Sequence, residues 1–170
     1  MIVSIEWLKE FVDINEPVAE LADLLTNAGL EAAVTGAPSE IPGVVIGTVE
    51  TAGQHPDADK LKLCTVNDGN VVHQVVCGAP NVEAGQTIAF AKVGSVLPGN
   101  SKLKKVTIRG VESSGMICSE RELQITDEHE CIMVLPSDLN PGDDFISAFG
   151  HRFISLELDI TPNRPDAFSH

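Results

Sequence analysis

Between residues 40 and 149 the sequence consists of short β-rich runs that glycine and proline interrupt at close intervals. Several short strands with turn residues between them are typical of a small β-barrel or sandwich. Asp68-Gly69 predicts a tight hairpin, Pro98-Gly99 a turn and Pro141-Gly142 the exit from the barrel. The spacing predicts an OB-fold, a Greek-key β-barrel, with extra edge strands. The expected strands cover residues 44–50, 61–67, 71–77, 87–93, 103–108, 115–118 and 131–135.

The first part of the chain predicts two helices. Ser4 is a good N-cap, and the apolar residues after it recur at three-to-four-residue spacing, which predicts a helix over residues 4–12. A second helix is expected to begin at Asn15-Glu16-Pro17, because proline is tolerated in a first helical turn. Gly29 is expected to end it in a left-handed conformation.

The last part of the chain predicts one strand. Residues 153–160 alternate apolar and polar side chains, which is typical of a half-buried strand. The nearest β candidate without a partner is 32–35. We therefore expect the barrel, residues 40–149, to be inserted into a small α+β unit. Residues 1–39 and 150–170 form that unit, which we expect to continue beyond residue 170.

Charge is segregated along the chain. Eleven basic and 25 acidic residues give a net charge of -14, which disfavours non-specific binding to a polyanion. Residues 112–130 contain six acidic side chains and one arginine. Residues 84–111, in contrast, contain no acidic side chain. Their basic residues are Lys92, Lys102, Lys104, Lys105 and Arg109.

Two motifs could bind ligands. In His55-Pro56-Asp57-Ala58-Asp59-Lys60-Leu61, a histidine and two aspartates could hold a divalent cation. A turn fixed by Pro56, with the short acids bonding nearby amides, is the interpretation we favour. In the second motif, from Lys104 to Met116, Arg109 could bind a phosphate or pair with Glu112 or Glu120. The neighbouring lysines favour RNA.

Nothing in the sequence indicates catalysis or a membrane span. The four cysteines lie far apart among apolar residues, which favours buried reduced thiols over zinc ligands, disulfides or nucleophiles. No Gly-rich phosphate loop, secretory signal or long apolar run occurs, so a cytoplasmic location is expected. Only Phe90 and Phe145 could stack on bases within the barrel, so any RNA affinity should be modest.

The two motifs together resemble the tRNA-binding OB module of several tRNA ligases and of free-standing tRNA-binding proteins. Four further segments, taken as a set, resemble the start of the beta subunits of bacterial phenylalanine-tRNA ligases. These segments are Ser4 to Val12, Cys77-Gly78-Ala79-Pro80-Asn81, Gly94 to Gly99, and Ile160-Thr161-Pro162-Asn163-Arg164-Pro165-Asp166.

This resemblance implies a parent enzyme with two alpha and two beta subunits that joins phenylalanine to its tRNA with ATP and magnesium. The active site then lies in the alpha subunit, and this chain holds no catalytic residue, metal or cofactor of its own. Its partners would be the phenylalanine tRNA and the alpha subunit. The alternative is a structural OB domain that packs subunits or domains without touching tRNA. The RNA-facing residues implied are His55, Lys60, Lys62, Lys104, Lys105, Arg109, Ser113 and Met116.

Overall fold

The computed structural model describes residues 1–36 and 40–160. The chain divides into two compact units, Met1–Ser39 with Gly150–His170, and Glu40–Phe149. Each unit is described here by itself. The motif at the end of the chain, residues 161–166, lies outside the described residues.

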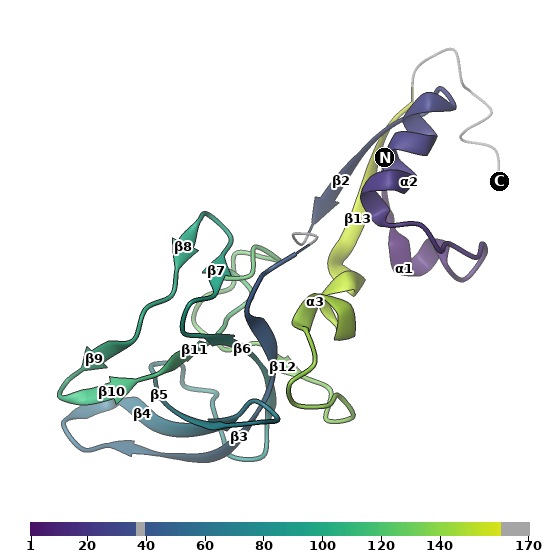
Figure 1. Cartoon of the computed structure of the whole chain (residues 1–170). Coiled ribbons are helices and arrows are strands. Elements are labelled where there is room, and N and C mark those ends of the chain that lie inside the picture. Colours follow the sequence, from purple (N-terminus) through teal and green to yellow (C-terminus); the bar gives the residue numbers. More distant parts are fainter. Residues whose placement is uncertain (37–39, 161–170) are drawn as a thin grey trace. The chain divides into compact units, whose positions relative to one another are not determined.

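The first unit is a three-stranded antiparallel sheet with helices (Figure 1). The sheet has the order β1-β13-β2, so the strand near the end of the chain lies between two strands from its beginning. Leu156 is opposite Val3 on one side and Val34 on the other. The predicted pairing of residues 32–35 with the last strand is confirmed. The elements are β1 Ile2–Ser4, α1 Ile5–Leu8, α2 Val18–Asn27, β2 Glu31–Gly36, the 3-10 helix η1 Gly150–Phe153 and β13 Ile154–Asp159.

The first helix is shorter than predicted, and the second matches its prediction. The Ser4 side chain caps α1 by accepting from the Trp7 amide at 3.5 Å, but α1 ends at Leu8. Residues 2–4 form β1 and pair with β13, a long-range contact that periodicity does not reveal. After α2, Gly29 takes a φ of +89° and Leu30 N–H donates to Leu25 at 2.9 Å. This arrangement is the expected C-terminal cap.

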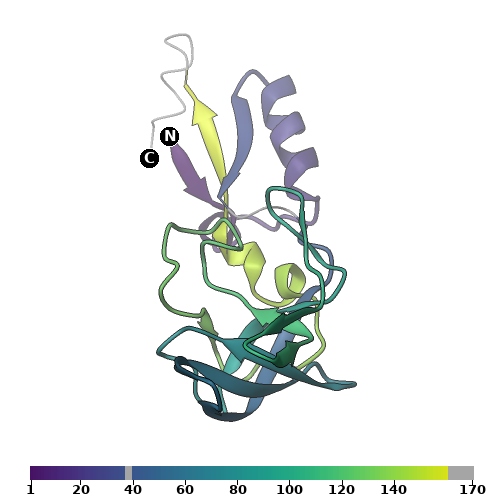
Figure 2. The same cartoon turned by 90° about the vertical axis from the view of Figure 1, so that its left-hand side faces the viewer.

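The second unit is a nearly closed barrel (Figures 1 and 2). Its main sheet has the order β11-β6-β3-β4-β5, with β12 also beside β6. The barrel closes between β5 and the start of β11, where Ser114 N–H donates to the Gln74 carbonyl at 2.8 Å. This confirms the predicted OB-type fold. The strands are β3 Val44–His55, β4 Ala58–Asn67, β5 Val72–Cys77, β6 Thr87–Lys92, β7 Val96–Leu97, β8 Ser101–Lys102, β9 Val106–Ile108, β10 Val111–Ser113, β11 Gly115–Ile117 and β12 Val134–Leu135; the helix α3 is Phe145–Ala148.

Four strands differ clearly in length from the prediction. β3 and β4 continue to His55 and from Ala58, so the first motif is a hairpin connection of only Pro56 and Asp57 rather than a longer loop. The predicted strand 103–108 is reduced to β9, because the chain makes two small hairpins here, β7–β8 and β9–β10. The predicted strand 131–135 is likewise reduced to β12.

The barrel core is built around apolar side chains from all of its main strands. Phe90 is fully buried, and a Cβ at Gly115 would meet its ring, so only glycine fits at this position, where β11 pairs with β6. Cys64, Cys77 and Cys118 are buried free thiols, as predicted, whereas Cys131 is half-buried. The central cluster comprises Val45, Val49, Cys64, Val66, Val75, Cys77, Val82, Ile88, Phe90, Ile117 and Ile132.

Candidate nucleic-acid interface

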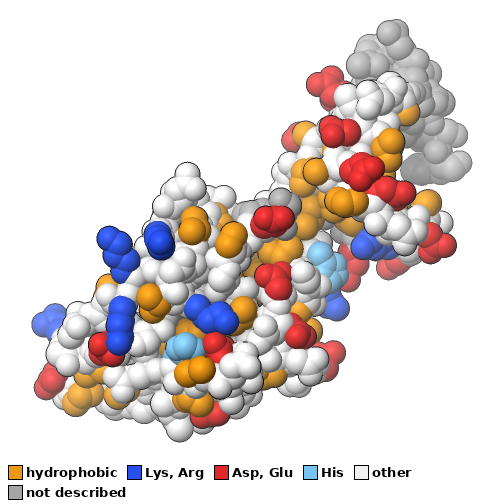
Figure 3. All heavy atoms as spheres, viewed as in Figure 1, with side chains coloured by type: hydrophobic (Ala, Val, Ile, Leu, Met, Phe, Trp, Pro, Cys, Tyr) orange, Lys and Arg blue, Asp and Glu red, His pale blue; other side chains and the backbone are white. Residues whose placement is uncertain are grey.

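Four of the eleven basic residues lie on one part of the barrel, which we call the basic arm and define as residues 96–113. The arm consists of the β7–β8 and β9–β10 hairpins. In Figure 3, Lys and Arg side chains gather over the part of the barrel where Figure 1 places β8 to β10. The four basic residues of the arm, all exposed, are Lys102, Lys104, Lys105 and Arg109.

Carboxylates neutralise only some of the basic side chains. Lys105 Nζ lies 2.7 Å from Glu112 Oε1 across the β9–β10 hairpin. Nζ of Lys92, at the end of β6, lies 3.4 Å from Asp68 Oδ2. Within residues 1–36 and 40–160, six other basic side chains of the barrel have no ion pair with a carboxylate. These are Lys60, Lys62, Lys102, Lys104, Arg109 and Arg121.

Arg109 lies at the tip of the arm in an unusual backbone conformation. Arg109 and Gly110 form a two-residue turn with φ values of +50° and +80°. Positive φ at both central residues defines the type I′ turn, whose twist matches that of a hairpin. Glycine adopts a positive φ readily, but a residue with a long side chain, such as arginine, rarely does. The turn therefore presents an exposed guanidinium at the end of a narrow hairpin.

The structure places His55 inside the molecule. Its side chain is 2% exposed. Nδ1 accepts the Asp57 amide at 3.1 Å, and Nε2 lies 3.3 Å from the carbonyl oxygen of Ile108. A neutral ring that accepts on Nδ1 carries its proton on Nε2, so it donates to Ile108. His55 thus links the β3–β4 connection to the tip of the basic arm.

Lys62 and Ser113 also have internal partners. Lys62 Nζ donates to the carbonyls of Pro80 at 3.1 Å and Val82 at 2.7 Å, which secures the loop after β5. Ser113 is buried, and its hydroxyl accepts from Val76 N–H at 3.1 Å and donates to the Gly115 carbonyl at 3.0 Å. These contacts lie within the barrel and occupy both the Lys62 ammonium and the Ser113 hydroxyl.

Met116 lies away from the arm, in a half-open cavity of about 520 Å³ at the ends of β5 and β11. Apolar and polar residues both line the cavity. Two of the lining residues, Glu122 and Glu130, are acidic, so the cavity does not favour phosphate. The lining residues are Cys77, Gly78, Ala79, Pro80, Met116, Ile117, Ser119, Glu122, His129, Glu130, Cys131 and Ile132.

The residues of the first motif form a turn. In the described part of the chain, no group of three His, Cys, Asp or Glu side chains is arranged to hold a metal ion. The His55 ring bonds to the Asp57 amide, which agrees with the turn interpretation. No described helix has the length and apolar character that crossing a membrane requires.

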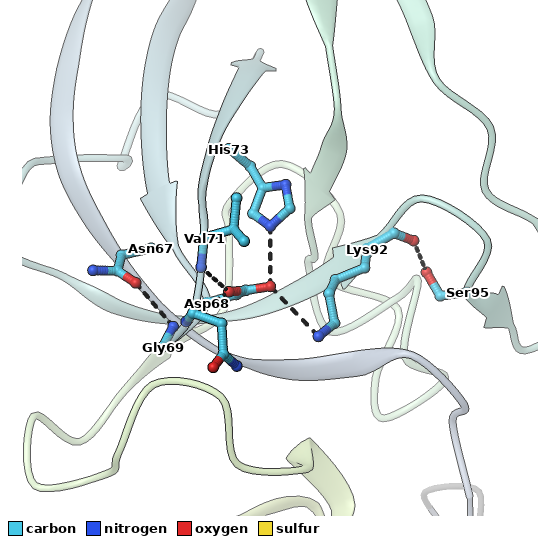
Figure 4. A network of polar contacts seen from close by, with 8 residues as sticks. Asn67, Asp68, Gly69, Val71, His73, Lys92 and Ser95 are labelled. Atoms are coloured by element: carbon cyan, nitrogen blue, oxygen red, sulfur yellow. Dashed lines mark hydrogen bonds and ion pairs between the residues drawn. The ribbon is translucent and has the colours of Figure 1, made fainter.

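Asp68 forms a buried polar network that the sequence did not reveal (Figure 4). Its carboxylate is 4% exposed and accepts from the amides of Asn70 and Val71 at 3.0 and 2.8 Å, and from His73 Nε2 at 3.0 Å. Burial alone would raise the pKa of Asp68. The Val71, His73 and Asn70 hydrogen bonds and the charge of Lys92 outweigh burial, so the pKa lies well below its usual range.

Three features of the site were not predicted from the sequence, and two of them have a signal that could have shown them. Lys102 belongs to the acid-free stretch but stood outside the two motifs. Arg109-Gly110 lies between two triplets containing β-branched residues, a pattern that indicates a two-residue hairpin. The tether from His55 to Ile108 has no such signal, because the two residues are 53 positions apart.

A nearly closed OB-type barrel with an exposed basic arm defines a class of nucleic-acid-binding modules. A family model described as "Putative tRNA binding domain" matches residues 44–144, which is more than half of the chain. The chain belongs to this tRNA-binding domain family.

Beta subunits of phenylalanine-tRNA ligases are among the relatives that the chain matches. The chain is 48% identical over 170 residues to the "Phenylalanine--tRNA ligase beta subunit" of Geobacter sulfurreducens and also to that of Geobacter metallireducens. The match covers 99% of this chain but only 21% of each relative, so the chain spans about a fifth of their length.

Among solved structures, a MetRS related protein from Pyrococcus horikoshii overlaps with a TM-score of 0.43 and 18% identity, covering 78% of this chain and 98% of that one. An overlap at this score carries no argument about function.

Proposed function

We propose that the chain is a non-catalytic tRNA-binding module of a phenylalanine-tRNA ligase beta subunit. It supports the attachment of phenylalanine to its tRNA in the cytoplasm, in a complex with the alpha subunit. ATP and magnesium act in the catalytic part of that complex rather than here. The family match and the near-complete coverage of this chain by the ligase relatives support the proposal.

The observation that carries the proposal is the set of basic side chains without carboxylate partners. In a chain with a net charge of -14, Lys102, Lys104 and Arg109 lie on one arm. Lys60 is placed near the same end by the tether from His55 to Ile108, because Ala58 on its strand pairs with His55. Figure 1 shows the β9–β10 turn and the β3–β4 connection at this end of the barrel.

The arrangement favours recognition of the phosphate backbone over recognition of bases. Phe90 and Phe145, the two candidates for base stacking, are fully buried and unavailable. Stacking typically contributes ~1 to 3 kcal/mol per base, so its absence makes the binding modest and strongly salt-dependent. We propose that Lys60, Lys102, Lys104 and Arg109 contact phosphates, and that His55, Lys62 and Ser113 maintain the shape of the module.

The test is a titration of the 170-residue chain with tRNA at several salt concentrations. Four phosphate contacts predict a slope of about -3 in the plot of log affinity against log salt. Lys104→Gln should weaken binding and reduce the slope by about 0.7. The matched control is Lys9→Gln, which removes the same charge from an exposed position in the other unit.

The alternative function is that of a structural OB domain that packs parts of the ligase. The overall negative charge is the observation in its favour. A flat salt dependence of the isolated chain would contradict tRNA contact. In the assembled ligase, unchanged aminoacylation by the double variant Lys102→Glu, Lys104→Glu would then support the packing role.

A further inference from the structure

We infer that His55 is a positioning residue for tRNA binding: it holds the tip of the basic arm in a binding-competent shape without touching RNA. The inference rests on the proposed function, because it describes how the tRNA-binding arm is kept in place. With 2% of its surface accessible, the His55 side chain cannot reach a nucleic acid, although its neighbourhood is part of the site.

The tip of the basic arm needs a contact that holds it to the barrel. In the described residues β9 pairs only with β10, so the tip of the arm is a two-stranded hairpin that extends from the barrel. An isolated two-stranded hairpin is at best marginally stable in water. The positive φ of Arg109 adds strain at the turn, and such conformations persist only where the surroundings maintain them.

Hydrogen bonds hold the β9–β10 hairpin at both of its ends. At its base, Gln74 Nε2 donates to the Glu112 carbonyl at 2.9 Å, and Val76 N–H donates to Ser113 Oγ at 3.1 Å. At its tip, His55 Nε2 bonds to the Ile108 carbonyl, the residue immediately before Arg109. His55 is thus the contact nearest to the turn that presents the guanidinium.

Holding the tip in place should raise the affinity for tRNA. A loop that is already in its bound shape loses less conformational entropy when it binds. Releasing the tip would therefore weaken tRNA binding by removing the contribution of Arg109, while Lys102 and Lys104, which precede β9, would be less affected. His55 and Arg109 should act as one unit rather than as two independent contributors.

The two nitrogens of His55 allow a matched pair of variants. In His55→Gln, the side-chain amide nitrogen can take the place of Nε2 and donate to Ile108. In His55→Asn, the shorter amide can take the place of Nδ1 and accept from Asp57, but it does not reach Ile108. The pair therefore separates the tether from the turn contact within one buried site.

The experiment measures tRNA affinity at several salt concentrations for the full chain and its variants. We expect His55→Asn to lower affinity about as much as Arg109→Gln does, to reduce the salt slope by about 0.7, and to add nothing further when combined with it. His55→Gln should bind like the unmodified chain. Amide exchange in His55→Asn should be faster for residues 106–113 and unchanged in β3 and β6.

A second variant keeps the test valid if His55→Asn does not fold. Gln74 is exposed, and Gln74→Ala removes a fastening at the base of the hairpin without leaving a buried cavity. It should speed exchange in residues 106–113 and lower tRNA affinity by less than Arg109→Gln does. Unchanged affinity in this variant would contradict the need for a fastened hairpin.

The outcomes distinguish this inference from the proposed function. If Lys104→Gln weakens binding while His55→Asn does not, or if the losses from His55→Asn and Arg109→Gln add, the positioning role is overturned and the tRNA-binding function stands. If no variant on the arm changes binding, the proposed function fails, and the positioning role fails with it.

Discussion

Lys105 and Glu112 face each other across the β9–β10 hairpin, with Nζ 2.7 Å from Oε1. Both side chains are more than half exposed, at 53% and 55%, so the pair contributes little to stability. Its effect is on the charge of the basic arm, because Glu112 is the acidic residue of the arm and occupies one of its four basic groups.

Glu112→Gln should therefore strengthen tRNA binding. The substitution frees Lys105 for a phosphate, so affinity should rise several-fold at low salt and the salt slope should steepen by about 0.7. The free energy of unfolding should change by less than about 0.5 kcal/mol. Binding titrations and urea unfolding check the two expectations. Glu10→Gln, the same change on the other unit, is the control, and an equal gain there would point to net charge alone.

Asp68→Asn should destabilise the barrel near neutral pH. The charged carboxylate accepts from two amides, His73 and Lys92, and its loss should cost about 1 to 3 kcal/mol. Because the folded-state pKa is lowered, this stabilisation is present above the unfolded value of about 4 and is lost as pH falls through the folded value.

Urea unfolding at pH 7, 4 and 3 measures that dependence. The difference between the unmodified chain and Asp68→Asn should be full at pH 7 and shrink only below about pH 4. Asp59→Asn, at an exposed position on β4, is the control and should have little effect. A difference that disappeared already between pH 7 and 5 would contradict a lowered pKa.

Alkylation should separate the cysteines by burial. Burial raises the pKa of Cys64 to about 11 and that of Cys118 to about 12, so at pH 8 neither forms an appreciable thiolate. Cys131 is half-buried and lines the cavity, so it should react first. Mass spectrometry after iodoacetamide treatment, with and without urea, measures this order. Rapid labelling of Cys118 in the folded chain would show that its burial is wrong.

Arg109→Asn should affect stability and binding in opposite directions. Asn-Gly suits a type I′ turn, so relief of the strained φ of +50° should stabilise the chain by about 0.5 to 1 kcal/mol. Loss of the guanidinium should weaken tRNA binding by about three- to tenfold. Unfolding and binding measurements on the same variant test both signs. Lys104→Gln should weaken binding with no gain in stability, and loss of stability in Arg109→Asn would contradict the turn assignment.

Local patterns predicted much of the fold. Alternation and turn residues predicted the main barrel strands, and the cap at Gly29 predicted the end of α2. The same patterns failed where long-range pairing decided the outcome. Residues 2–4 became a strand because β13 lies beside them, and residues 103–105 lost their predicted strand because the chain folds into two separate hairpins.

By itself the sequence determined the periodicity of the strands, the acid-free stretch and the composition of the basic arm, because these properties belong to neighbouring residues. Tertiary structure alone decided which charged groups are available. Closure of the barrel brings Asp68 to Lys92, buries Ser113, and places His55 against Ile108, which is 53 residues away. Burial and pairing depend on contacts between distant segments. They leave Lys104 and Arg109 facing solvent, whereas other basic and polar groups of the same motifs bind partners within the fold.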